Sequence, residues 1–173
     1  MRTEGIFAWL EQARIAYFSQ ELEGLNTEST ILDSLLVLPE MTQTVARTIL
    51  GCFLFSRDDV FKRIRDLSMG EKCHVAFLKL YFSGANLLVL DEPANYFDVE
   101  TKEKVEQALQ GFTGAFVVVS HDRYLIRKLA TRLLFLGQDS VLFLYEGSWQ
   151  EYEEEQNRKL QEPDNPEAAD EVR

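Results

Sequence analysis

Two short runs of apolar residues, separated by one helix-like stretch, constrain the fold of this chain most strongly. Residues 87–90 and 115–119 contain no polar side chain, and each run has the length of a strand. Strands that are apolar throughout are typically buried on both faces, as in a parallel sheet. Residues 100–110 between them have a helical pattern that ends at Gly111. Strand, helix, strand with right-handed crossovers predicts an α/β fold, with a mostly parallel sheet flanked by helices.

The remaining sequence adds strands and helices around this core. Aromatic and β-branched residues predict strands, and caps and apolar periodicity predict helices. The further predicted elements are strands at 6–10, 14–18, 133–136 and 141–145, and helices at 30–66, 67–82 and 122–130. Within 30–66, Val45, Ile49 and Phe53 recur at helical spacing and predict one apolar face.

Length and composition divide the chain into segments. Its 173 residues leave room for one domain. We expect core strands and a loop in 1–29, a small helical subdomain in 30–66, the remaining core in 67–150 and a disordered acidic tail in 151–173. The net charge is −11, and that tail holds nine acidic and three basic residues. The negative net charge disfavours a protein that binds nucleic acid over most of its surface. It is compatible with a local basic patch on residues 1–150.

Cysteine usage and hydropathy predict a cytoplasmic protein. Cys52 and Cys73 are not in a paired spacing, and with two histidines they form no convincing metal set. Free cysteines suit a reducing compartment. No apolar run approaches the roughly 18–20 residues that cross a bilayer, and we expect neither a signal peptide nor membrane insertion.

Two carboxylates follow the first apolar run directly. Asp91 and Glu92 lie at the carboxyl end of a predicted parallel strand, which is where α/β sheets bind ligands. Asp91 could hold Mg²⁺ beside phosphate groups, and Glu92 could orient or deprotonate a water molecule. The alternative is two solvated acids before Pro93, because strings of this kind are common.

Three further units could face the same ligand. Ser68 and Glu71 form a capping-box pattern, and the helix start around Met69 and Gly70 could bind an anion or be a plain cap. His121 follows the second apolar run and could contact a terminal phosphate or a water, or be an ordinary histidine at a strand end. Gln20 could reach Mg²⁺ or water, but a lone glutamine carries little information.

Taken in this order, the units resemble the motifs of the ATPase domain of the ATP-binding cassette (ABC) superfamily. The resemblance extends over residues 14–150. Gln20 resembles the Q-loop, 67–71 the signature motif, 87–91 Walker B followed by the catalytic glutamate at Glu92, 93–98 the D-loop and 120–123 the switch-histidine region.

The resemblance implies ATP hydrolysis with Mg²⁺ between two ATPase domains. It assigns Glu92 as the base and His121 as the sensor of the γ-phosphate. It also places Asp91 and Gln20 at the metal. The nucleotide contacts that it implies, partly with ATP held by a partner domain in cis or in trans, are Gln20, Ser68, Met69, Gly70 and Asp98.

Several strings are similar to one branch, the ABC-F proteins. These strings are 14–20, 71–72, 120–124 and 146–149. The branch implies a soluble protein with two ATPase domains that acts on the ribosome, in translation or antibiotic resistance. The acidic tail resembles the end of the second domain. Four bases around the signature could contact ribosomal RNA or form a solvated face: Lys62, Arg63, Arg65 and Lys72.

The largest departure from the family pattern is the phosphate loop, G-x-x-x-x-G-K-[ST]. None of the nine glycines is followed by lysine. In the family this loop lies just before the segment that begins this sequence, so we expect a truncated domain: a fragment, a split reading frame or a decayed copy. Such a chain would expose apolar surface and, alone, would bind ATP weakly and be inactive.

Smaller departures lie in two motifs. Met69 replaces the first signature glycine, and Ala94, Tyr96 and Phe97 replace the usual D-loop residues. The helix start should tolerate Met69 because Gly70 remains, whereas the D-loop replacements put the fine coupling between sites in doubt. Two other functions stay open: the nucleotide-binding subunit of a membrane transporter, and a non-catalytic fragment, which the missing phosphate loop favours.

Overall fold

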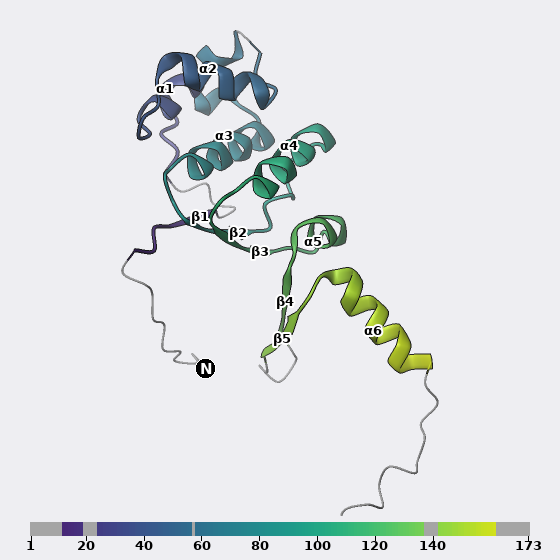
Figure 1. Ribbon diagram of the computed structural model, residues 1–173. Coiled ribbons are helices and arrows are strands. Elements are labelled where there is room, and N and C mark those ends of the chain that lie inside the picture. Colours follow the sequence, from purple (N-terminus) through teal and green to yellow (C-terminus); the bar gives the residue numbers. More distant parts are fainter. Residues whose placement is uncertain (1–11, 19–23, 57, 137–141, 162–173) are drawn as a thin grey trace, which may run out of the picture. The chain divides into compact units, whose positions relative to one another are not determined.

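The computed structural model describes residues 12–18, 24–56, 58–136 and 142–161 (Figure 1). It divides the chain into two compact units, Met1–His121 and Asp122–Arg173, which are described separately. This division differs from the single domain that the length suggested. The predicted strand at 6–10, Gln20 and residues 162–173 lie outside the described residues.

A parallel sheet forms the centre of the first unit. Its strands are β1 (Ile15–Phe18), β2 (Leu87–Asp91) and β3 (Ala115–Val119), in the spatial order β1-β2-β3. Both pairings are parallel, and the register aligns Tyr17 with Val89 and Val89 with Val117. The predicted α/β class and its parallel sheet are confirmed.

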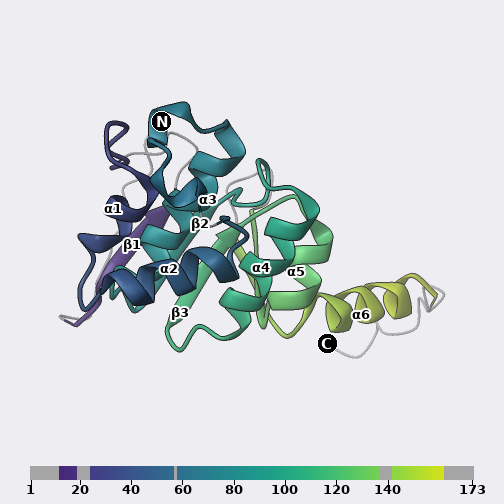
Figure 2. The same ribbon diagram turned by 90° about the horizontal axis from the view of Figure 1, so that it is seen from above.

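Helices α3 (Met69–Tyr81) and α4 (Val99–Gln110) lie on one face of this sheet (Figures 1 and 2). On that face Leu88 and Leu90 are fully buried. The opposite face is open within the described part of this unit. Its side chains at Ile15, Tyr17, Val117 and Val119 are between 42% and 59% exposed. Among the described residues of this unit, helices pack on one face of the sheet, so the expected burial on both faces is not found within it.

A small helical layer packs against α3. It contains α1 (Ile31–Leu36), α2 (Gln43–Cys52) and the short 3₁₀ turns η1 (Asp59–Phe61) and η2 (Ile64–Asp66). Its shared core with α3 consists mainly of aliphatic side chains: Ile31, Leu32, Leu35, Ala46, Leu50, Val60, Ile64, Val75 and Leu78. Helices form within the predicted segment 30–66, and two residues of its predicted apolar face, Ile49 and Phe53, pack against this core. Ala46 and Leu50 are buried, whereas Val45 is 45% exposed.

Aromatic side chains join α2, α3 and the loop after β2. The ring of His74 lies 5.0 Å from Phe55, 5.6 Å from Phe53 and 6.1 Å from Phe97, measured between centroids. His74 is 5% exposed, and its Nε2 atom has no hydrogen-bond partner among the described residues. Burial lowers the pKa of His74 from 6.5 to about 4, although the nearby Asp98 carboxylate acts in the opposite direction.

The second unit contains a β-hairpin that is preceded by one helix and followed by another along the chain. Helix α5 (Arg123–Leu129) precedes the antiparallel strands β4 (Arg132–Leu136) and β5 (Leu142–Glu146), and α6 (Trp149–Gln161) follows them. The predicted hairpin is confirmed, although its turn at 137–141 lies outside the described residues. None of the described helices is both long and apolar enough to cross a membrane.

The acidic tail was predicted to be disordered from residue 151, and this is wrong for 151–161, which belong to α6. The prediction relied on the high acidic content and missed several local signals of a helix. The Ser148 backbone N–H donates to Glu151 (2.7 Å) at the helix start, and Glu155 pairs with Lys159 one turn later (2.8 Å). On its apolar side, the Tyr152 ring lies 4.6 Å from that of Phe135 on the hairpin.

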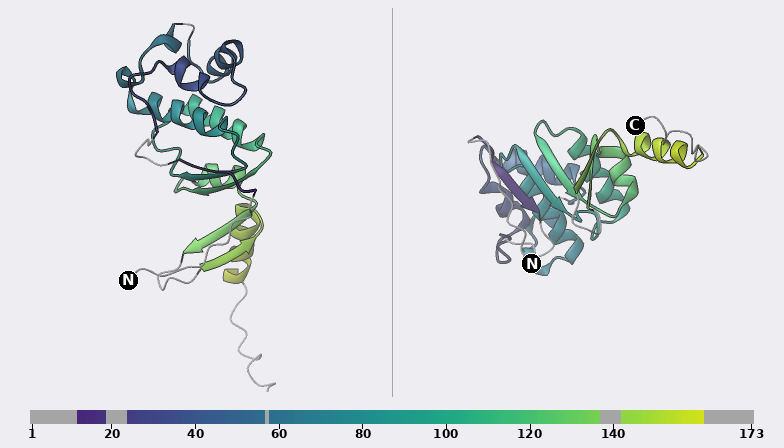
Figure 3. Two further views of the ribbon diagram at one scale, coloured as in Figure 1. Left: turned by 90° about the vertical axis from the view of Figure 1, so that its left-hand side faces the viewer. Right: turned by 90° about the horizontal axis from the view of Figure 1, so that it is seen from below.

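The two faces of the hairpin differ. Phe135 and Tyr145 contact the aromatic side chains at the start of α6. The other face carries a leucine patch, defined as Leu134, Leu136, Leu142 and Leu144, whose members are between 55% and 80% exposed. Figure 3 shows this hairpin beside α6.

Gly70 is required where α3 approaches the loop after β2. A Cβ atom at residue 70 would lie 2.7 Å from the Tyr96 carbonyl oxygen, which is closer than real contacts allow. We predict that Gly70→Ala lowers the free energy of unfolding by about 1–3 kcal/mol in urea denaturation, because backbone must move. Gly51→Ala is the matched control. It lies in helix α2 with no atom within 4 Å of the added Cβ, so it should raise stability by about 0.5–1 kcal/mol. Equal effects of the two substitutions would contradict the close approach.

His74 should make stability fall in acid. The unfolded chain binds a proton at this histidine near pH 6.5, whereas the folded chain does so near pH 4, so stability is lost as the pH falls through this interval. Between pH 7.5 and 5 we expect a loss of about 2 kcal/mol from this group. Urea denaturation at both pH values should show that His74→Phe removes this part of the loss. His121→Gln, which changes an exposed histidine, should retain it. Identical pH profiles for all three proteins would disprove the assignment.

Candidate functional site

The carboxyl edge of the parallel sheet brings together three of the predicted site residues. Asp91 is the last residue of β2 and Glu92 follows it, while His121 lies two residues beyond β3. Because β2 and β3 are parallel and in register from Leu87 to Asp91, both strands end at the same edge. The His121 Nε2 atom lies 3.7 Å from the Glu92 Oε1 atom. The predicted proximity is therefore present for Glu92 and His121, and Asp91 lies at the same edge of the sheet.

Glu92 is held in an unusual backbone conformation. Its φ angle is +46°, in the left-handed region that non-glycine residues seldom adopt. Its N–H donates to the Val119 carbonyl (2.8 Å), which ties the residue to β3 beyond the end of the β2 ladder. Its side chain is 13% exposed, whereas that of His121 is fully exposed. Strained residues of this kind cluster at functional sites, where surrounding bonds maintain them.

Asp91 has a neighbour that sequence reasoning did not identify. The Tyr17 hydroxyl donates to the Asp91 Oδ2 atom over 3.4 Å, a long hydrogen bond from β1. Both residues belong to the open face of the sheet, since strand side chains alternate and Tyr17 is aligned with Val89. Strand parity could have placed Tyr17 on a face, but the β1–β2 register, which was needed for the contact, is not written in the sequence.

The start of α3 is a complete capping box, as predicted. The Ser68 backbone N–H donates to Glu71 (2.8 Å), and the Glu71 N–H donates to the Ser68 hydroxyl (3.3 Å). Hydrogen bonds from Ser68 lower the pKa of Glu71. The hydrogen bonds of the described residues leave the N–H groups of Met69 and Gly70 free, as is usual in a first helical turn. An anion could therefore still bind at these two amides, and this role stays a prediction.

The loop between β2 and α4 is anchored in the core. Ala94 and Phe97 are buried, and the Phe97 ring contacts Phe18 and Phe77. Asp98 caps α4, since its carboxylate accepts from the Thr101 N–H (2.8 Å), and this bond lowers the pKa of Asp98. The structure thus gives Asp98 a structural role, and contact with a nucleotide stays a prediction. Gln20 lies outside the described residues, so its proposed place at the metal is not described.

The predicted basic patch is largely paired with acids of the same unit. Arg63 and Arg65 both contact Glu28, at 3.1 and 2.9 Å, and Lys62 contacts Asp59 at 2.5 Å. The hydrogen bonds from Lys62 and Ser56 lower the pKa of Asp59 to about 2. These contacts favour the solvated-face alternative for the bases, since their charges are balanced locally.

The donor set fits Mg²⁺ bound together with phosphate better than a dedicated metal centre. No group of three or more metal-binding side chains gathers among the described residues. Mg²⁺ commonly uses one or two carboxylates and completes its shell with water and substrate phosphates. Asp91, at the strand end and beside the Tyr17 hydroxyl, can supply such a carboxylate.

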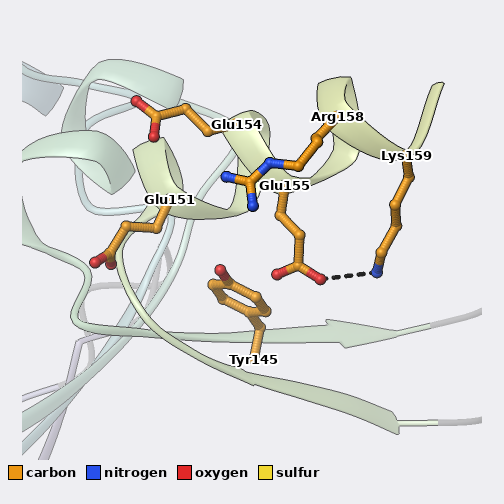
Figure 4. Close-up of a pocket in the computed structure, with 6 residues that line it drawn as sticks. All are labelled: Tyr145, Glu151, Glu154, Glu155, Arg158 and Lys159. Atoms are coloured by element: carbon orange, nitrogen blue, oxygen red, sulfur yellow. Dashed lines mark ion pairs between the residues drawn. The ribbon is translucent and has the colours of Figure 1, made fainter. Parts of the chain in front are cut away.

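A separate hollow occurs in the second unit (Figure 4). It has a volume of about 440 Å³ and lies between Tyr145 of β5 and charged side chains of α6. Figure 4 shows Glu155 between Tyr145 and Lys159. Glu155 and Lys159 form an ion pair of 2.8 Å. Glu151, Glu154 and Arg158 complete its lining. It is open and contains none of the predicted site residues, so it is not the candidate site.

Comparison with known proteins identifies the family. The sequence profile of the ABC transporter family matches residues 6–95. The chain is 39% identical over 159 residues to the putative ATP-binding protein YdiF of Bacillus subtilis (strain 168), covering 91% of this chain and 25% of YdiF. It is also 39% identical over 119 residues to the energy-dependent translational throttle protein EttA of Escherichia coli (strain K12), covering 69% of this chain and 21% of EttA.

A solved structure agrees on the fold. The dimeric ATP-binding cassette MJ0796, in a post-hydrolysis state bound to ADP and Pi, superimposes with a TM-score of 0.63 at 20% identity. The match covers 78% of this chain and 63% of that one. This chain spans about a quarter of the length of the curated relatives that it matches. By its profile match, its relatives and the parallel sheet that carries the site, the chain belongs to the ABC transporter family of ATP-binding proteins.

Proposed function

We propose that this chain supplies the signature, Walker B and switch-histidine part of an ATP-hydrolysing domain of the ABC-F type. The observation that carries the proposal is the 3.7 Å approach of His121 to Glu92, directly after Asp91 at the sheet edge. A carboxylate that activates water and an imidazole that senses phosphate must face one small ligand. The shared edge of parallel strands provides this arrangement.

Each side chain has a definite task in this proposal. Asp91, together with Gln20, would hold Mg²⁺, which would supply positive charge to balance the phosphates of ATP. Glu92 accepts a proton from the attacking water, and the hydrogen bond from its N–H to Val119 holds the backbone that carries the carboxylate. His121, whose side chain is exposed, donates a hydrogen bond to the terminal phosphate.

The start of α3 would act on a second ATPase domain. Ser68, Met69 and Gly70, together with Asp98 at the start of α4, would contact ATP that is held by the phosphate loop of a partner domain. Met69 is 51% exposed and the N–H groups of residues 69 and 70 are free, so this surface is accessible to a partner. This role in trans does not need a phosphate loop in this chain, which is consistent with the missing Gly-Lys pair.

The partner of the complete protein is proposed to be the ribosome. The name of EttA refers to translation, and the strings at 14–20 and 120–124 resemble the same ABC-F branch. The proposal includes a cytoplasmic location and leaves translation and antibiotic resistance as alternative tasks. The profile description, ABC transporter, supports the second candidate, a nucleotide-binding subunit of a membrane transporter.

We predict that the purified chain alone does not bind MgATP. Without a phosphate loop it lacks most of the backbone donors that hold the β- and γ-phosphates. Isothermal titration calorimetry should give no binding heat up to about 1 mM nucleotide. Full-length YdiF is the positive control for the titration. Micromolar affinity of the chain alone would show that binding does not require a G-x-x-x-x-G-K-[ST] loop in this chain.

Added to an isolated ATPase domain of EttA, the chain should raise the rate of ATP hydrolysis. Met69→Glu should reduce this stimulation at least tenfold, because it places a negative charge opposite the partner's phosphates while a glutamate in the first helical turn leaves α3 stable. Val37→Glu is the control, since Val37 is 76% exposed and lies outside the signature. Phosphate release gives the rate. Stimulation that is absent, or that survives Met69→Glu, counts against a role in trans.

A further inference from the structure

The side chain of Asp91 has a neighbour that none of the sequence motifs indicates. The Tyr17 hydroxyl, on β1, donates a hydrogen bond to the Asp91 Oδ2 atom over 3.4 Å. We propose that Tyr17 is a positioning residue: it engages one oxygen of this carboxylate, presents the other to a cation, and so favours Mg²⁺ over Ca²⁺ at the site. The inference rests on the proposed function, since it concerns the ion that Asp91 would hold there.

Strand pairing brings these two side chains together. Strands β1 and β2 are parallel, and their register places Tyr17 opposite Val89, two residues before Asp91. Side chains two residues apart on a strand share a face, so Tyr17 and Asp91 lie on the same face of the sheet. A residue on the next strand and two positions along is a diagonal neighbour, which an aromatic side chain is long enough to reach. The contact therefore follows from the strand register and the length of the tyrosine side chain.

Neighbouring contacts hold the backbone of both residues. Phe18, the residue after Tyr17, is 3% exposed, and its ring lies 6.5 Å from that of Phe97, which anchors the end of β1 in the core. Asp91 is paired with Val119 on β3. The main freedom left to the Asp91 carboxylate is thus rotation about its own side-chain bonds.

The Tyr17 hydroxyl restricts this rotation and makes the two carboxylate oxygens unequal. The Asp91 Oδ2 atom accepts its hydrogen bond, whereas Oδ1 accepts none from the part of the chain that the structure describes. Carboxylates that bind metal ions in proteins are usually held by such outer hydrogen bonds, and loss of the outer partner changes metal binding. Asp91 therefore offers a cation one unengaged oxygen in a defined direction.

A single oxygen suits Mg²⁺ better than Ca²⁺. Mg²⁺ demands near-octahedral geometry, uses one or two carboxylates and keeps several waters. Ca²⁺ takes about six to eight oxygens in flexible geometry and accepts both oxygens of one carboxylate. Among the described residues no group of three or more metal-binding side chains gathers, so they do not supply the larger oxygen set that Ca²⁺ prefers. Engagement of Oδ2 by Tyr17 removes a further oxygen from it.

The test titrates Mg²⁺ and Ca²⁺ separately into the full chain and follows the side-chain carboxyl ¹³C signal of Asp91 by NMR. The signal is identified by its absence from Asp91→Asn, and both ions are diamagnetic, so it stays visible. Tyr17→Phe removes the hydroxyl and keeps the ring. We expect this variant to lower the ratio of the Mg²⁺ to the Ca²⁺ affinity at Asp91 at least about threefold, because the freed Oδ2 can join Oδ1 on Ca²⁺.

Tyr124→Phe is the matched control. Tyr124 lies on α5 in the second unit, is 63% exposed, and its ring lies 5.4 Å from the Lys128 Nζ atom. This variant should keep the affinity ratio of the unsubstituted chain. A general structural effect of Tyr17→Phe would weaken both ions alike and leave the ratio unchanged, which overturns the inference. An equal fall in the ratio for both variants overturns it as well.

The same titration separates this inference from the proposed function. Asp58 is exposed and its side chain makes no cap hydrogen bond, so its signal gives the response of an ordinary surface carboxylate. If Asp91 responds to Mg²⁺ more strongly than Asp58 and Tyr17→Phe leaves the ratio unchanged, the selectivity is rejected and the metal role of Asp91 stands. If Asp91 responds to Mg²⁺ no more strongly than Asp58, that role is rejected, and the inference with it.

Discussion

The parallel pairing of β2 with β1 and β3 is the interaction on which the rest of this structure depends. It aligns the ends of strands that are far apart in the sequence, and so it brings Asp91, Glu92 and His121 to one edge. The bond from the Glu92 N–H to the Val119 carbonyl extends this pairing into the site itself. Were the strands antiparallel, the acids and the imidazole would lie at opposite edges. The arrangement of the site therefore depends first on the parallel topology of the sheet and only then on which side chains stand at the strand ends.

Local signals in the sequence were sufficient to predict most of the helices and strands. The apolar runs predicted β2 and β3, Ser68 with Glu71 predicted the start of α3, and Gly84 adopts the expected left-handed conformation after it. The acidic composition hid α6, because its stabilising contacts are specific pairs that a charge count does not register. The number of faces on which the sheet is covered could not be read locally either, because burial depends on what else packs there.

The candidate site was predictable as a set of residues but not as a geometry. The motifs identified Asp91, Glu92 and His121. The contact of Tyr17 with Asp91 could not be predicted without the strand register, and the requirement for glycine at residue 70 could not be predicted without the position of the Tyr96 carbonyl. His74 is similar: its sequence neighbours are unremarkable, and burial among phenylalanines from two segments, after α2 and after β2, lowers its pKa. That packing connects the helical layer to the loop after β2.

The leucine patch on the β4–β5 hairpin has a consequence for the fate of the chain in a cell. Four neighbouring leucines on a two-stranded ribbon are the kind of surface that holdase chaperones capture and that promotes self-association. A copy in which these leucines stay uncovered would be removed by proteolysis faster than one in which they are covered. The steady-state abundance of this polypeptide would then be set by its rate of turnover, with assembly acting as the event that protects it.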